Sequence, residues 1–135
     1  MRLMQSHRKR EHDALRASMA RFLAMLDAPA GVDQISLLRE RMLFSQAFST
    51  HLLNEHNDLH KLANAGQSAI LRERDTKIPK LREDYSTHIR QWTPPLITSD
   101  PSGYRSAVLA LQRRLLDIME WEERILPIFA IGFVN

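Results

Sequence analysis

The residues of this chain best suited to chemistry are a histidine and a glutamate four positions apart. His51 and Glu55 lie within residues 48–62, and on a helix this spacing puts both side chains on one face, about 6 Å apart along the axis. The same face carries apolar residues at helical spacing, namely Phe44, Phe48, Leu52, Leu59 and Leu62. An imidazole and a carboxylate pointing into an apolar core need partners, because burying an unpaired polar group is costly. A metal ion shared with other helices would be one partner; hydrogen bonds or simple exposure are the alternatives.

The composition limits which metal site could form. The chain has no cysteine, which excludes a disulfide framework, a thiolate metal site and a cysteine nucleophile. Any metal ion would have to be held by imidazole and carboxylate groups, a ligand set that suits iron, manganese or zinc. No arrangement of a nucleophile with a base is visible, so we do not expect an enzyme.

Length and charge are those of an ordinary soluble protein. The chain has 135 residues, of which 44% are hydrophobic and 26% charged, and we expect residues 1–135 to form one domain. No apolar run is long enough to cross a membrane, and the basic start is not followed by an apolar segment, so we expect a cytoplasmic protein without a secretory signal. The net charge of +3 comes from acids and bases that are interspersed, which argues against a nucleic-acid partner.

Hydrophobic periodicity predicts four long amphipathic helices. The first should span residues 6–27, and the second should begin after Asp33 as N-cap and end near Gly66. The third should extend to Trp92, with a break or kink near Thr76 to Pro79. The last should begin at Asp100 and Pro101 and end before residue 127. No strand pattern is found, so we predict an all-α, antiparallel up-down-up-down four-helix bundle.

Several polar groups lie at a similar distance from one end of such a bundle. Counting residues from the loops at a rise of 1.5 Å each, five side chains from three helices agree within roughly 10 Å: His12, His51, Glu55, Asp117 and Glu122. His88 lies roughly 15 Å from that level on a regular helix. The third helix should therefore contribute a weak ligand or none.

The same residues form a recognisable set of motifs. These are Glu11-His12 in the first helix, His51-x3-Glu55-His56 in the second, His88 with Trp92 in the third, and Glu122-Glu123 followed by Pro127 in the fourth. With them the chain resembles the hemerythrin-like (HHE cation-binding) family over nearly its whole length. The resemblance implies a metal site inside the bundle, with two irons in many members, and a part in dioxygen or redox sensing or in metal storage. It places His12, His51 and Glu55 on ligand positions.

The fourth helix departs from the family pattern. The family has a histidine four or five residues before the carboxylate, where this chain has Asp117, Ile118 or Met119. We therefore predict an incomplete or lost di-metal site that holds one iron, two or none. The candidate metal ligands are His12, His51, Glu55, Asp117, Glu122 and His88.

Two alternatives to metal binding remain open. The chain could be a metal-free protein–protein interaction module on the same fold, or a histidine phosphotransfer bundle that uses His60. The tail at residues 128–134 is uncharged and apolar, and left in water it would expose several hundred Å² of apolar surface. It must fold back over one end of the bundle or pack against a second chain, and we predict a homodimer with the tail at or beside the interface.

Overall fold

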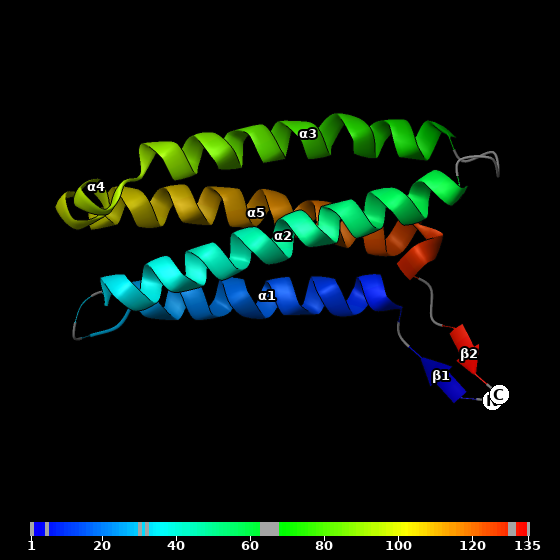
Figure 1. The fold of residues 1–135 in the computed structure, drawn as a ribbon, viewed down its shortest axis with the longest axis horizontal. Helices are drawn as coiled ribbons and strands as arrows, with labels where there is room; N and C mark the ends of the chain where they lie inside the picture. Colours follow the sequence, from blue (N-terminus) through cyan, green and yellow to red (C-terminus); the bar gives the residue numbers. More distant parts are fainter. Residues whose placement is uncertain are drawn as a thin grey trace.

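The computed structural model describes residues 2–4, 6–29, 31, 33–62, 68–129 and 132–134. Four long helices make up most of it: α1 (His7–Leu26), α2 (Gln34–Leu62), α3 (Ser68–Gln91) and α5 (Pro101–Ile125). They lie side by side, and each runs opposite to the long helix before it in the chain (Figure 1). The predicted all-helical class is confirmed.

Four short elements complete the described part of the chain, and the sequence patterns predicted none of them. A short helix, α4 (Pro94–Ser99), follows α3, and a 3₁₀ turn, η2 (Pro127–Phe129), follows α5. Strands β1 (Arg2–Met4) and β2 (Gly132–Val134) pair antiparallel and bring the two ends of the chain together (Figure 1). Three-residue strands are too short to show an alternating pattern. The two prolines that end α3 start α4, because proline is well tolerated in the first turn of a helix.

Side chains cap the starts of α1 and α5. The Ser6 hydroxyl accepts a hydrogen bond from the amide of Lys9 at 3.0 Å, which satisfies one free donor at the start of α1. Asp100 accepts from the amide of Gly103 at 3.0 Å and is followed by Pro101 at the first position of α5. A Cβ at position 103 would come too close to that carboxylate, so a larger residue there would require the Asp100 side chain to shift.

Helix α3 passes through Pro79, where we had expected a break or kink; a break is not found. Proline has no amide hydrogen to bond the carbonyl four residues earlier. Pro79 faces solvent, where water can bond that carbonyl, while Ile78 and Leu81 are buried on the opposite side. Packing of this inner face keeps the helix continuous in spite of the local penalty.

Apolar layers occupy the space between the long helices. The central layer takes two residues from each of them: Leu15, Met19, Phe48, Leu52, Ile78, Leu81, Leu115 and Met119. A second layer, including Phe22, Trp92 and Tyr104, lies toward α4. At the opposite end a small group forms from Leu59, Leu126 and Phe129. In the described part of the chain, no helix is both long and apolar enough to cross a membrane.

The beginning of the apolar tail folds back onto its own chain. Phe129 is buried, and its ring lies 4.4 Å from the ring of His12 in α1, measured between centroids. This is one of the two arrangements considered from sequence, near the start of the first helix. Ala130 and Ile131 lie outside the described residues, and the homodimer stays a prediction.

Candidate metal centre

Four buried side chains from three helices meet between the central layer and the Leu59–Phe129 end of the bundle. They are His12 from α1, His51 and Glu55 from α2, and Glu122 from α5. One ligand atom of each lies within 4.8 Å of the others, and none of the four residues is more than 3% exposed. Their predicted convergence is confirmed. Such a group of imidazoles and carboxylates could hold a metal ion.

Helical spacing explains why these residues face inward together. His12 lies one turn before the buried Leu15, and His51 lies between Phe48 and Leu52 along the buried side of α2. Glu122 follows the buried Met119 by three positions on α5. Each of these side chains therefore lies on the apolar face of its helix, because residues three or four apart share one side of a helix.

The outer nitrogen of each imidazole is held by a carboxylate. His12 Nδ1 lies 2.8 Å from Glu123 Oε2, and His51 Nδ1 lies 2.6 Å from Glu11 Oε1. Arginines hold these two acids in turn: Arg16 bonds Glu123 at 2.7 Å, and Arg8 bonds Glu11 at 2.8 Å. A carboxylate in an ion pair only accepts, so both rings donate through Nδ1. The same arrangement orients histidines that bind metals.

The inner nitrogens point at the buried acids without making regular hydrogen bonds. His51 Nε2 is 3.0 Å from Glu55 Oε2, and His12 Nε2 is 3.4 Å from Glu122 Oε1 and 3.7 Å from Glu55 Oε2. Within the described residues, both Nε2 atoms and Glu55 Oε2 lack a hydrogen-bond partner with suitable geometry. A buried polar atom left in this way calls for a specific explanation.

A metal ion would provide that explanation. Zinc, for example, binds imidazole nitrogen and carboxylate oxygen at about 2.0–2.2 Å, so its ligand atoms lie about 3–4 Å apart. The separations found here, at most 4.8 Å, are close to that range. The donor set therefore fits a metal ion after a small inward movement of the side chains.

A fifth buried group, Arg74 from α3, completes the cluster and was missed by the sequence analysis. Its Nε donates to Glu55 Oε1 at 2.5 Å and lies 3.1 Å from Glu122 Oε2, while Nη1 bonds Asp75 at 3.2 Å. Arg74 is only 4% exposed. The signal was present in the sequence, because the buried stripe of α3 continues one turn upstream from Ile78 to Arg74. Arginine is usually exposed, and the expected break at Thr76 to Pro79 ended the stripe too early.

Burial and neighbouring charges shift the pKa values of the cluster's groups in different directions. Burial lowers the pKa of His12, but its contacts with Glu122, Glu55 and Glu123 outweigh that effect and raise the value to about 9. Burial raises the pKa of Glu122 to about 8, with a further contribution from the neighbouring Glu55. Burial acts the same way on Glu55, but contacts with His12 and His51 and the charge of Arg74 hold its pKa well below the usual range. Glu55 is therefore the permanently ionised acid of the pair.

Asp117, one of the candidate ligands, lies outside the cluster. Its side chain is 60% exposed and accepts a hydrogen bond from Arg113 at 2.6 Å. Asp117 and Glu122 are five positions apart, which is about 140° around a helix, so they cannot both face inward. The inclusion of both acids in one ligand set was therefore wrong, and Glu122 is the one that points to the cluster.

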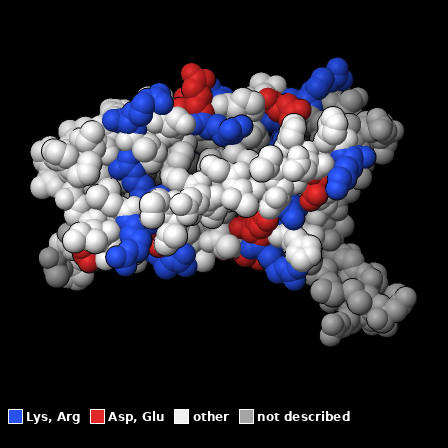
Figure 2. Space-filling model, viewed as in Figure 1, with Lys and Arg blue, Asp and Glu red and all other residues white. Residues whose placement is uncertain are grey.

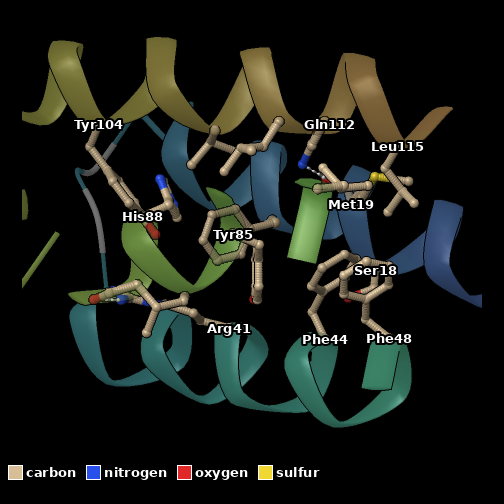
Figure 3. Close-up of a pocket in the computed structure, with 15 residues that line it drawn as sticks. Ser18, Met19, Arg41, Phe44, Phe48, Tyr85, His88, Tyr104, Gln112 and Leu115 are labelled. Carbon is tan, nitrogen blue, oxygen red and sulfur yellow. Dashed lines mark hydrogen bonds between the residues drawn. The ribbon is translucent and has the colours of Figure 1, made fainter. Parts of the chain in front are cut away.

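His88, the other outlying candidate, lies in the apolar layer toward α4. Its ring stacks on Tyr104 at 5.6 Å between centroids and on Tyr85 at 6.3 Å. Figure 3 shows it beside Tyr104 in the wall of a mostly apolar cavity of about 60 Å³. This placement agrees with its expected difference in depth, and its listing among the candidate ligands was wrong.

The burial of His88 predicts a specific acid sensitivity. Burial, with a smaller contribution from Arg41, lowers its pKa from 6.5 to about 4. Between these two values the unfolded chain binds more protons at this site than the folded protein does, so stability falls as pH falls from 6.5 to 4. His88→Phe should remove about 2–3 kcal/mol of this loss. Urea unfolding at pH 7 and pH 4.5 would measure it.

His60→Gln is the matched control, because His60 is exposed on α2. It should leave the pH dependence of the wild type unchanged. An equal loss of stability on acidification in wild type and His88→Phe would contradict the expected role of His88.

Comparisons with known proteins give no match: no family model, no curated protein and no solved structure matches this chain. The hemerythrin-like resemblance therefore depends on the residues of the chain itself. The function is inferred below from the geometry of the cluster.

Proposed function

We propose that this chain is a hemerythrin-like helical bundle that binds a metal ion through His12, His51, Glu55 and Glu122. The observation that carries the proposal is a set of three buried ligand atoms that find no suitable partner among the described residues, two of them on imidazoles whose other nitrogen is already held by a carboxylate. A cluster serving only as a hydrogen-bond network would pair these atoms, because an unpaired buried polar group costs about 1–3 kcal/mol.

Iron is the metal we propose, with dioxygen or redox sensing or metal storage as the function. Two imidazoles and two carboxylates without a thiolate suit iron, manganese or zinc, and the family resemblance favours iron. Bound iron would supply one-electron and dioxygen chemistry. The chain itself binds and orients the ion: Glu11 and Glu123 fix the two rings, and the buried Phe129 covers His12.

Binding also requires protons to leave. The pKa of His12 is raised to about 9 and that of Glu122 to about 8, so both groups are largely protonated at neutral pH and each must release its proton before it can act as a ligand. Glu123, on the outer nitrogen of His12, keeps the ring in position during this change.

The test is metal titration of the purified chain and of His51→Ala. We expect wild type to bind Fe²⁺ under anaerobic conditions, and Zn²⁺ as a second probe. We expect the dissociation constant to rise at least about 100-fold in His51→Ala, since even the supporting groups around metal ligands are worth 10–100-fold. Isothermal titration calorimetry and elemental analysis measure both quantities.

His56→Ala is the control for this experiment. His56 lies on the same helix but is exposed, and its removal should not change the affinity. Wild type that binds metal no more tightly than His51→Ala would rule out this centre.

The second candidate function is that of a metal-free interaction module, and one surface feature favours it. The outer face of α2 is uncharged over residues 42–54 and exposes Ile35, Met42 and Leu53 at 74%, 54% and 60%. Figure 2 shows this face as a band without charged side chains along α2. Exposed apolar residues grouped in this way are typical of partner-binding surfaces. If the purified chain contains and binds no metal, this function is the one to pursue, by light scattering and cross-linking.

A further inference from the structure

Each of the two buried carboxylates of the cluster presents one oxygen to the histidines and the other to Arg74. Glu55 Oε2 and Glu122 Oε1 face the inner nitrogens of the histidines, at 3.0 to 3.7 Å. Glu55 Oε1 and Glu122 Oε2 face away from them and lie 2.5 and 3.1 Å from Nε of Arg74. The pair of acids thus joins two separate cation positions, one beside the imidazoles and one taken by the guanidinium.

We infer that Arg74 occupies the position of a second cation and so fixes the centre at one metal ion per chain. This inference depends on the proposed metal-binding function and extends it to the number of ions and to the group that sets it. Arg74 remains in place beside the acids when the metal binds.

The chemistry of the guanidinium supports this assignment. Arginine stays protonated in proteins and has only donors, so it cannot be a metal ligand. It neutralises the outer oxygens through charge-assisted hydrogen bonds, as a second cation would. In the described part of α3, the buried neighbours of Arg74 one and two turns on are Ile78 and Leu81, which offer no ligand atom for another ion.

The surroundings of Arg74 hold it in this position. It lies in the wall of a groove between α2 and α3, with Leu52 and Ile78 beside it and His56, Asp75 and Arg82 nearer the surface. Asp75 holds Nη1 from the outer side at 3.2 Å. Moving the guanidinium away would leave the outer oxygens of two buried acids without a partner, which is strongly unfavourable. A metal ion beside the histidines needs no such movement.

The experiment combines zinc stoichiometry with NMR of the arginine side chain. Wild type should bind one Zn²⁺ per chain, and the Nε–H signal of Arg74 should persist and stay protected from hydrogen exchange after loading. Arg74→His replaces the cation by a ligand and should bind close to two Zn²⁺. Arg72→His adds a histidine two positions earlier at an exposed site and should still bind one.

Each outcome decides the question. Two Zn²⁺ in wild type, or loss of the protected Arg74 signal on loading, overturns the inference while the proposed function stands. No Zn²⁺ or Fe²⁺ bound by wild type overturns both. If Arg74→His does not fold, the wild-type stoichiometry and the Arg74 signal still give the answer. Two Zn²⁺ in Arg72→His as well would show that any added histidine has the effect, and would count against a specific role of Arg74.

Discussion

Arg74→Met is expected to lower the free energy of unfolding of the metal-free protein by about 3–5 kcal/mol. The substitution keeps an unbranched side chain of similar length and removes the cation that contacts both Glu55 and Glu122. Contacts with His12 and His51 and the charge of Arg74 together hold Glu55 ionised, so losing Arg74 removes part of the compensation of a buried carboxylate. Urea denaturation followed by circular dichroism, at pH 7 with a chelator present, measures the change.

The matched control is Arg82→Met on the same helix. Arg82 is exposed, and surface substitutions of this kind usually change stability by less than about 0.5 kcal/mol. Adding Glu55→Gln to Arg74→Met should recover part of the loss, because it removes the buried carboxylate that has lost its arginine partner. Equal stability of Arg74→Met and Arg82→Met would show that the arginine contributes nothing to the cluster.

The second large effect is expected in metal affinity: Glu55→Gln should weaken it by about 100-fold or more. Glu55 Oε2 is near both inner imidazole nitrogens, and the low pKa of Glu55 keeps it available as an anion across the physiological range. Glutamine preserves the size of the side chain but removes the charge, so packing is retained while the strongest ligand is lost. Competition with a chromophoric zinc chelator gives the two dissociation constants.

Asp117→Asn provides the comparison for Glu55→Gln. Asp117 was a candidate ligand from sequence but pairs with Arg113 at the surface. Its removal should leave the affinity of the wild type unchanged. A loss as large as that of Glu55→Gln would mean that the ion is bound elsewhere.

The sequence contained enough information to predict most of the fold and four members of the cluster. Caps such as Ser6 and Asp100 act on their own helix, and an apolar stripe fixes the inward face by the same local geometry. His51 and Glu55 share a face because they are four residues apart. Their meeting with His12 and Glu122 followed from counting residues along antiparallel helices, since the rise per residue is constant.

The tertiary structure decided the features that depend on neighbouring helices. Counting depth along α5 did not separate Asp117 from Glu122, because both lie near the level of the histidines; the side of α5 that carries Leu115 and Met119 is buried in the structure, and Glu122 lies on that side. Whether α3 continues through Pro79 depended on its buried side, and the entry of Arg74 depended on that continuity. The long side chain of Arg74 is held in the cluster by two acids from other helices, Glu55 and Glu122. The hydrophobic periodicity of α3 carries no information on where those acids lie.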